Sequence, residues 1–193
     1  MSEFERAARA VADGELVVYP TETVYGLGAD ALSTTAVERV FAAKGRPRDD
    51  PISLGVPSVA AARQYTNPTE RELELMQAFL PGPATVLVEK GADVPDVLTG
   101  GRDRVGIRVP AHDLARDLLE ATGPLTATSA NVSGRPSVRT VADLDPEIRE
   151  RAAVVLDGGE TDGTESTVVD VASETIIREG AMATAIREWL ATN

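Results

Sequence analysis

The chain has 193 residues, and its 31 acidic residues against 19 basic ones leave a formal net charge of −12. It contains no cysteine and only one histidine, His112, which excludes disulfides, thiolate catalysis and cysteine- or histidine-rich metal sites. Residues 1–15 are charged and amphipathic, unlike a signal peptide, and no apolar run reaches the length of a membrane span. We therefore expect a cytoplasmic protein with no membrane partner, and we interpret the acidic excess as halophilic adaptation.

Helical and strand patterns alternate along the whole chain. In chain order, hydrophobic periodicity and turn residues predict a helix over 3–13, a strand over 15–20, a helix over 34–44, a strand over 52–56, helices over 57–65 and 68–82, strands over 84–89 and 104–110, a helix over 113–122, a strand over 124–129, a helix over 141–151, strands over 152–157, 166–171 and 175–179, and a helix over 181–192. Residues 157–165 are expected to form a flexible loop. This interleaving favours an α/β fold with a mixed sheet, in a single domain over residues 1–193.

The segment KGRPRDD, residues 44–50, concentrates positive charge in this acidic chain. Its three cations alternate with a glycine and a proline at the end of a predicted helix. One cation there is expected to interact with the free carbonyl groups of the helix C-terminus. The stiff spacing of Lys44 and Arg46 also suits a polyanion, because arginine binds phosphate oxygens in pairs and lysine adds a compact charge. The segment alone is compatible with both interpretations.

Two segments that follow predicted strands hold hydroxyl and amide groups. In SANVSGRPS, residues 129–137, Ser129 and Asn131 either contribute to an anion-binding nest or form an Asx turn. In PTETVYG, residues 20–26, the hydroxyl of Thr23 either caps a turn or points into a cleft. The adjoining GLGADA matches a dinucleotide-binding pattern in its letters. It does not open a helix directly after a strand, which argues against a nicotinamide site.

The strand predicted over 104–110 carries two arginines on one face. Arg104 and Arg108 are four residues apart, so they point to the same side, and the apolar residues between them point to the other. A strand between helices is normally buried on both faces, so Arg108 requires either an internal carboxylate or an acidic ligand. Arg178, at the end of the strand predicted over 175–179, poses the same choice.

In combination and in this order, several segments resemble the YrdC-like threonylcarbamoyl-adenylate synthase family. They are YPTETVYGLGADA, the K-x-R of KGRP, PGPATVLV, VGIRVP, the S-x-N of SANVSGRPS, STVVDV and REGA, and they extend from residue 4 to about 181. The resemblance implies a twisted mixed sheet flanked by helices, with a large concave cavity, in the single-domain form of the family. It also implies that L-threonine, bicarbonate and ATP, with Mg²⁺, are converted to threonylcarbamoyl-AMP and pyrophosphate for tRNA modification.

The resemblance also implies roles for individual positions. Thr23 and Arg108 fall where the family binds L-threonine. The positions implied for ATP are Lys44, Arg46, Asp50, Ser129, Asn131, Ser137 and Arg178. Two positions depart from the family pattern, because Asp50 replaces an asparagine and Gly55 replaces a histidine near the threonine. An aspartate beside phosphates is tolerable where Mg²⁺ lies between them, and no metal site made by the protein alone is expected.

The resemblance further implies partners for the product. Separate proteins would transfer the threonylcarbamoyl group to tRNA, and tRNA itself is expected to bind weakly at most, because the chain is acidic. The alternative function is a non-catalytic module that binds tRNA or double-stranded RNA, although basic and aromatic residues are not interleaved as that function requires. A nearer alternative uses carbamoyl phosphate, as in the related domain of hydrogenase-maturation proteins, which are much larger, cysteine-bearing chains.

Overall fold

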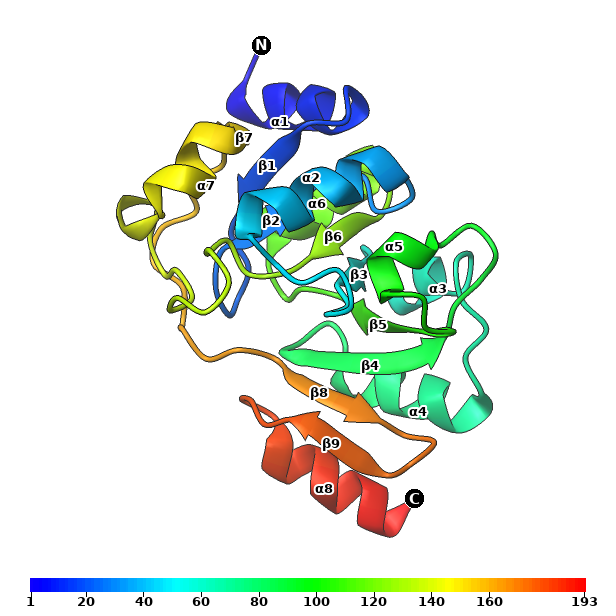
Figure 1. Cartoon of the computed structure of the whole chain (residues 1–193). Coiled ribbons are helices and arrows are strands. Elements are labelled where there is room, and N and C mark those ends of the chain that lie inside the picture. The colour runs from blue at the N-terminus through cyan, green and yellow to red at the C-terminus, as the bar shows by residue number, and fades with distance from the viewer.

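Helices and strands alternate along the chain, as the sequence pattern predicts (Figure 1). The computed structural model describes residues 1–193. The helices are α1 (Glu3–Ala12), α2 (Thr34–Lys44), α3 (Val59–Ala62), α4 (Glu70–Phe79), α5 (Asp96–Thr99), α6 (Asp113–Thr122), α7 (Pro146–Arg151) and α8 (Ala183–Thr192), with a 3₁₀ helix, η1 (Val141–Asp143). The strands are β1 (Leu16–Tyr19), β2 (Gly26–Gly28), β3 (Ser53–Gly55), β4 (Ala84–Glu89), β5 (Arg104–Arg108), β6 (Leu125–Ala127), β7 (Ala152–Val155), β8 (Thr167–Asp170) and β9 (Thr175–Arg178). None of the helices combines the length and apolar character needed to cross a bilayer.

The strands form two mixed sheets that adjoin at one edge. The smaller sheet has the order β2-β1-β7, and the larger has the order β6-β3-β5-β4-β8-β9. In the smaller sheet β1 is antiparallel to β2 and parallel to β7, and in the larger β5 is parallel to β3 and antiparallel to β4. The two sheets meet where the Leu27 N–H donates to the Thr128 carbonyl at 2.8 Å. The predicted mixed α/β architecture is confirmed, with its strands divided between two sheets.

Capping residues account for the start of α4 and the end of α2. At the start of α4 the Thr69 hydroxyl accepts from Glu72 N at 3.3 Å, and the Glu72 carboxylate accepts from Thr69 N at 2.7 Å. Helix α2 ends at Gly45, whose φ of 59° is left-handed and favours glycine. The chain therefore leaves the helix axis at Gly45, between Lys44 and Arg46.

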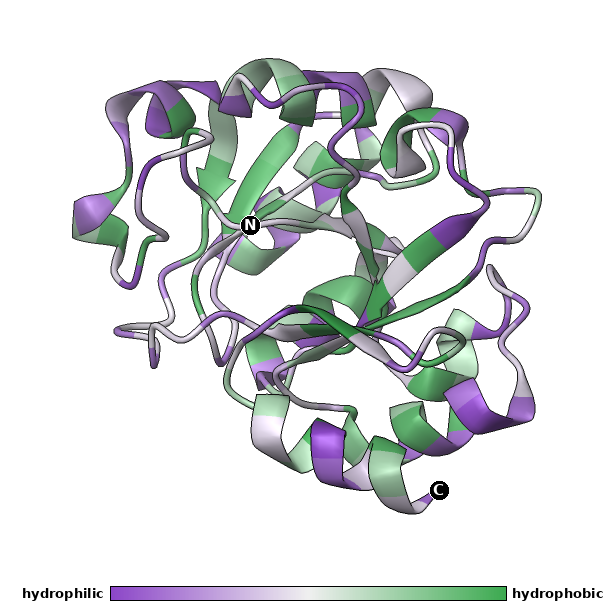
Figure 2. Cartoon of the chain, turned by 60° about the horizontal axis from the view of Figure 1, so that its bottom comes forward, coloured by the Kyte–Doolittle hydropathy of each residue, from purple (hydrophilic) through white to green (hydrophobic).

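The core is built from aliphatic side chains, in keeping with an aromatic content of only 4%. Figure 2 shows apolar strands at the centre of the molecule and polar residues along the outer helices. The main cluster contains 33 buried residues from both sheets, with Tyr25 and Phe41 as its aromatic members. A second cluster of 10 residues packs α1 and α6 against β1. Both clusters contain residues of the smaller and the larger sheet, so they hold the two sheets together.

Strand β5 lies inside the larger sheet and has two different faces. Val105 and Ile107 are at most 1% exposed and belong to the main core. Arg104, Gly106 and Arg108 point to the opposite face, as the two-residue period of a strand requires. That face forms the floor of a cavity, so only one face of β5 belongs to the apolar core.

Several segments differ from the sequence-based expectation. Strand β2 was not predicted, because its sequence GLG has glycine at two of three positions and shows no alternation of side chains, and the single turn α5 was not predicted either. The helix predicted over 141–151 divides into η1 and α7, because Pro146 begins α7 and disfavours a helical residue before it. The segment 157–165 has no helix or strand, yet its backbone is anchored where the Gly163 N–H donates to the Thr23 carbonyl at 2.7 Å.

Candidate functional site

A cavity of about 790 Å³ lies between the two sheets. Its floor is one face of the larger sheet, formed by alternate residues of three neighbouring strands: Ser53 and Gly55, Thr85 and Leu87, and Arg104, Gly106 and Arg108. The opposite wall comes from the turn after β1 and from the chain after β6. Five arginines and three carboxylates line the cavity, so its lining is positive in a chain of net charge −12. The large concave cavity that the family resemblance implies is present.

Gly106 keeps the floor of the cavity open. A Cβ atom at this position would lie 2.6 Å from Ser53 Oγ and 2.8 Å from Thr85 Cγ2, closer than such atoms approach. A side chain at residue 106 would therefore displace its neighbours or fill the cavity. The sequence analysis missed this role, although a glycine between two arginines on the same strand face was visible in the sequence.

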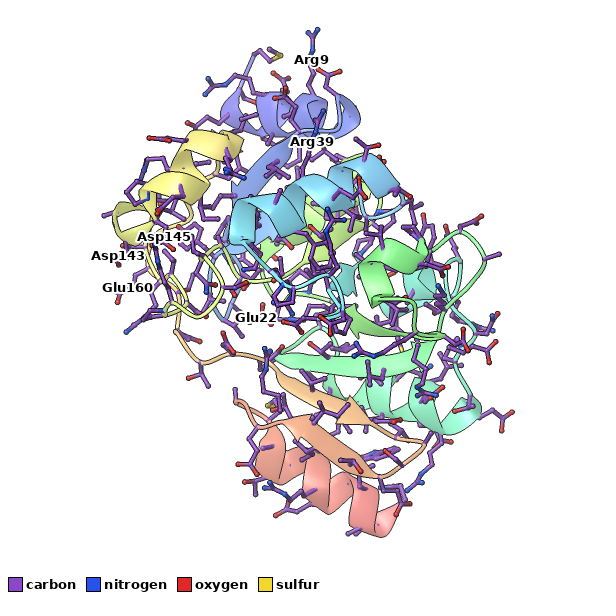
Figure 3. All side chains as sticks on the ribbon, in the orientation of Figure 1. Arg9, Glu22, Arg39, Asp143, Asp145 and Glu160 are labelled. Carbon is purple, nitrogen blue, oxygen red and sulfur yellow. The ribbon has the colours of Figure 1, made fainter.

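Arg108 lies at the floor of the cavity and is only 6% exposed. Its Nη2 donates to Glu22 Oε1, and its Nη1 donates to the carbonyls of Gly82 and Val109, the latter at 3.1 Å. The second oxygen of Glu22, Oε2, is buried without a hydrogen-bond partner. Glu22 was not among the predicted site residues, and it is the internal carboxylate that a buried arginine requires. Figure 3 labels Glu22 in the region between the two sheets.

The turn after β1 places Thr23 beside Arg108 in the cavity wall. The Thr23 and Thr21 hydroxyls are 2.9 Å apart, and Thr21 also donates to the Val24 carbonyl at 2.6 Å. Both readings of this segment are therefore realised, because Thr21 holds the turn while Thr23 lines the cavity. Burial raises the pKa of Tyr19 to about 12, so this wall residue remains a neutral phenol, with its hydroxyl donating to Thr126 O at 3.3 Å.

Lys44 joins the end of α2 to the S-x-N loop from behind the cavity wall. It is 1% exposed, and its ammonium donates to the carbonyls of Ser129 and, at 2.8 Å, Asn131. Ser129 lines the cavity, whereas Lys44 and Asn131 do not. Burial first, and then the nearby Arg46, lower the pKa of Lys44 to about 8. The two motifs therefore meet in space, with the lysine holding the loop by its backbone.

Arg46 and Asp50 lie at the rim of the cavity and fold their own segment into a turn. Arg46 Nε donates to the Asp50 carbonyl at 3.0 Å, and Nη2 lies 3.0 Å from Asp50 Oδ1. Arg48 lies elsewhere, with its guanidinium 3.1 Å from Glu38 Oε1 and 5.7 Å from the centre of the Phe41 ring. Of the three cations in KGRPRDD, only Arg46 faces the cavity.

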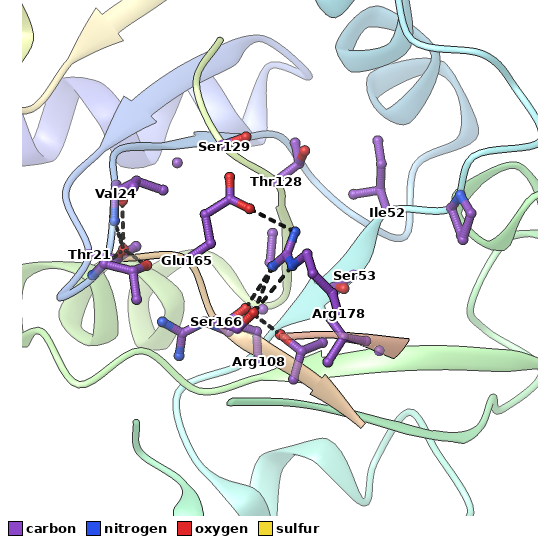
Figure 4. Close-up of a pocket in the computed structure, with 18 of the residues that line it drawn as sticks. Thr21, Val24, Ile52, Ser53, Arg108, Thr128, Ser129, Glu165, Ser166 and Arg178 are labelled. Atoms are coloured by element: carbon purple, nitrogen blue, oxygen red, sulfur yellow. Dashed lines mark hydrogen bonds and ion pairs between the residues drawn. The ribbon is translucent and has the colours of Figure 1, made fainter. Parts of the chain in front are cut away.

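The remaining positions expected to bind ATP lie at the end of β9, which carries Arg178, and in the segment after β6, which carries Asn131 and Ser137. Arg178 lines the cavity and donates from Nε and Nη2 to the Ser166 carbonyl at 3.2 and 3.0 Å. Its Nη1 lies 3.2 Å from Glu165 Oε2, and Glu165 Oε1 accepts from the Ser137 hydroxyl, as Figure 4 shows for the arginine pair. Asn131 Nδ2 donates to the Arg135 carbonyl at 2.8 Å.

The acidic side chains do not form a metal cage. No group of three or more histidine, cysteine, aspartate or glutamate side chains gathers at one point. Asp50, Asp103 and Glu165 are the carboxylates that line the cavity. Mg²⁺ is commonly held by one or two carboxylates together with substrate phosphates, so this donor set fits an ion that arrives with a nucleotide.

The fold and cavity define an α/β protein with a cation-lined cleft between two sheets, and comparison with known proteins places it in a family. The Sua5/YciO/YrdC model, described as "Telomere recombination", matches residues 9–180. The chain is 43% identical to the threonylcarbamoyl-AMP synthase of Pyrococcus abyssi, over 86% of this chain and 49% of that protein. It is 37% identical to the protein of the same name in Bacillus subtilis, over 93% of this chain and 54% of that protein.

Solved structures agree with the family assignment. The crystal structure of Pyrococcus abyssi Sua5 complexed with L-threonine superposes with a TM-score of 0.85 and 40% identity, covering 93% of this chain and 55% of that one. The chain belongs to the Sua5/YciO/YrdC family, so the predicted resemblance is confirmed. It spans about half the length of the Pyrococcus abyssi and Bacillus subtilis relatives.

Removing the internal partner of Arg108 is expected to destabilise the protein. Glu22→Ala leaves a buried guanidinium without its carboxylate and should lower the free energy of unfolding by about 3 kcal/mol. Glu22→Gln should cost less, because its amide oxygen still accepts a hydrogen bond. Urea unfolding measures both, with Glu179→Ala as the control, since Glu179 pairs with Arg187 at the exposed surface. Equal losses for Glu22→Ala and Glu179→Ala would contradict the pairing argument.

The lowered pKa of Lys44 predicts a pH-dependent stability. The folded pKa of about 8 lies below the ordinary lysine pKa of 10.5, so folding releases a proton between these two pH values. The contribution of Lys44 to the free energy of unfolding should therefore rise as the pH increases through this window. Urea unfolding between about pH 7 and about pH 10 should show a more positive slope for the wild type than for Lys44→Met. Parallel curves for the two proteins would show that the Lys44 pKa is not lowered by folding.

Proposed function

We propose that this protein is an L-threonylcarbamoyladenylate synthase, which forms threonylcarbamoyl-AMP and pyrophosphate from L-threonine, bicarbonate and ATP. The observation that carries the proposal is that one cavity is lined by two sets of residues. The first set is Arg46, Ser129 and Arg178, and the second is Thr23 and Arg108. The first three are positions implied for ATP, and the last two are positions implied for threonine. Membership in a family whose curated relatives carry this activity in their names supports the same reaction.

The nucleotide phosphates would bind along the side of the cavity that holds Arg46 and Arg178. Both guanidiniums line the cavity and can present pairs of N–H groups to phosphate oxygens. The Ser129 hydroxyl would orient one of these oxygens. Lys44 would act from behind, because its ammonium holds the carbonyls of Ser129 and Asn131 and so keeps the loop in position. The Asn131 side chain would reach the phosphates only after it rearranges, and the Ser137 hydroxyl only after Glu165 leaves it.

Threonine would bind at the other side of the cavity. Arg108 would bind the carboxylate of the threonine substrate, and the Thr23 hydroxyl would form a hydrogen bond with another of its polar groups. The Tyr19, Thr21 and Val24 side chains complete this wall. Gly55 lines the same cavity without a side chain, so recognition of the amino acid would depend on Arg108 and Thr23.

The reaction requires positioning and charge stabilisation more than covalent work by the protein. The threonine amine forms a bond to the carbon of bicarbonate, a C–O bond breaks and water leaves, which gives a carbamate. An oxygen of this carbamate attacks the α-phosphorus of ATP. The bond from this phosphorus to the bridging oxygen breaks, and pyrophosphate leaves with the electron pair. Arg46 and Arg178 would neutralise the charge that develops on it. When bound with the nucleotide beside Asp50, Mg²⁺ would supply further charge neutralisation of the phosphates.

The proposal extends to the place of the protein in the cell. We infer a cytoplasmic, salt-adapted enzyme whose product is consumed by separate proteins that transfer the threonylcarbamoyl group to tRNA. Direct tRNA binding would be weak, because the net charge is −12 and Arg46, Arg108 and Arg178 in the cavity already have carboxylate partners. The same features disfavour the alternative function as an RNA-binding module.

Pyrophosphate release provides the direct test of the reaction. With ATP and Mg²⁺ at high KCl concentration, release should require both L-threonine and bicarbonate, because the carbamate of threonine is the attacking group. Each component is omitted in turn, and serine replaces threonine in a parallel assay. Release that is independent of threonine and bicarbonate, or no release from folded protein, would contradict the proposal.

Arg46→Ala should reduce turnover at least about 100-fold, because it removes one of the two guanidiniums that would stabilise the leaving pyrophosphate. Folding should be little affected, since Arg46 lies at the cavity rim and its removal leaves no buried charge. The measurement is pyrophosphate release together with urea unfolding. Arg48→Ala is the matched control, because the same segment carries Arg48 away from the cavity. Full activity of Arg46→Ala would exclude Arg46 from the phosphate site.

A further inference from the structure

Glu165 places a negative charge among the groups that the proposed function assigns to the ATP phosphates. Its Oε1 accepts from the Ser137 hydroxyl, and its Oε2 lies 3.2 Å from Arg178 Nη1. Figure 4 shows its side chain reaching into the cavity, with a dashed line to Arg178 and with Ser129 close by. Neither the sequence motifs nor the proposed mechanism gives this carboxylate a role.

A carboxylate and a phosphate use the same kind of donor. Both accept hydrogen bonds from guanidinium N–H groups and from hydroxyls. A phosphate oxygen that binds Arg178 Nη1 and the Ser137 hydroxyl would occupy the position of the Glu165 oxygens. The two anions therefore exclude each other from these donors, and like charges at such short range also repel.

The attachment of Glu165 allows its side chain to move while its backbone stays in place. Its carbonyl accepts from the Ala181 N–H at 3.2 Å, and a Cβ at Gly180 would lie only 2.3 Å from the same oxygen. The Glu165 backbone, which directly precedes β8, is thus packed tightly against the turn after β9. The carboxylate can leave Arg178 by rotation about side-chain bonds.

The pair between Glu165 and Arg178 is weak enough to be displaced. The Glu165 side chain is 38% exposed and that of Arg178 is 48% exposed, so water screens their attraction. Arg178 would keep its position without Glu165, because Nε and Nη2 donate to Ser166. A phosphate group carries more charge than a carboxylate and can bind the guanidinium through two oxygens.

We propose that Glu165 is the resident anion of the phosphate subsite. It occupies Arg178 and Ser137 when the subsite is empty, and it leaves when the phosphates bind. By returning to the same donors, it competes with pyrophosphate and so favours release of this product. This inference rests on the proposed function, because it takes the ATP phosphates as the ligand of the subsite.

Glu165→Gln tests the competition, with inorganic pyrophosphate as the probe in titration calorimetry. The variant removes the negative charge but keeps the shape, and it should bind pyrophosphate about tenfold more tightly than the wild type. Glu165→Ala should show the same direction, which covers the case of a new hydrogen bond from the amide. Both are titrated with and without Mg²⁺, and circular dichroism verifies the fold of each.

Glu160→Gln is the matched control for net charge. It makes the same charge change in the same loop, but Glu160 is 65% exposed and pairs with Arg139, at 2.8 Å. Figure 3 labels it at the outer edge of the molecule. The affinity of the Glu160→Gln variant for pyrophosphate should equal that of the wild type. Equal tightening by Glu160→Gln and Glu165→Gln would show a general charge effect and overturn the proposal.

Other results also overturn the proposal and indicate what replaces it. Weaker binding by both Glu165 variants only when Mg²⁺ is present would make Glu165 a ligand of the ion. Weaker binding regardless of Mg²⁺ would make it a positioning residue for Arg178. Unchanged affinity would remove any role at the subsite. If folded wild-type protein does not bind pyrophosphate at all, the proposed phosphate site itself fails, which separates that failure from the failure of Glu165 alone.

Discussion

The two faces of β5 are the constraint on which the site depends. Val105 and Ile107 are required in the main core, so the two-residue period of the strand turns Arg104, Gly106 and Arg108 to the other side. A helix packed on that side would bury the arginines without enough partners, at a high cost in free energy. The sheet therefore keeps an open face, and the smaller sheet closes the space from the opposite side. The cavity follows from the packing of one central strand.

Charge compensation inside this cavity explains how an acidic chain supports a cation-lined site. Each cavity arginine proposed to bind substrate has a carboxylate of the chain beside it. The pairs are Arg46–Asp50, Arg108–Glu22 and Arg178–Glu165. The pairs differ in burial, because Arg108 and Glu22 are both largely buried whereas Arg178 and Glu165 are both partly exposed. The Arg108–Glu22 pair therefore maintains the fold, and the Arg178–Glu165 pair can exchange its carboxylate for an incoming anion.

Lys44 illustrates which features of the site could be predicted from the sequence and which could not. The residue types of KGRPRDD indicated a site, and the structure does bring its K-x-R beside the S-x-N motif. The resemblance implied that Lys44 binds ATP, and the structure adds that its ammonium donates to two backbone carbonyls, those of Ser129 and Asn131, behind the cavity wall. Glu22 and Glu165 were missed by the sequence analysis. In a chain with 31 acidic residues, a single carboxylate carries no signal that distinguishes it from the surface.

The sequence by itself determined the order and type of most elements, because apolar periodicity and turn residues act over a few neighbouring positions. It also determined which side of β5 carries Arg104 and Arg108, since that depends only on the period of a strand. The tertiary structure alone decided that the strands divide into two sheets and that Arg46, Arg108 and Arg178 each pair with a particular carboxylate. Arg108 and Glu22 are 86 residues apart in the chain, and Lys44 and Ser129 are 85 apart. Contacts at that separation depend on how the whole core packs, and no local pattern of residues encodes them.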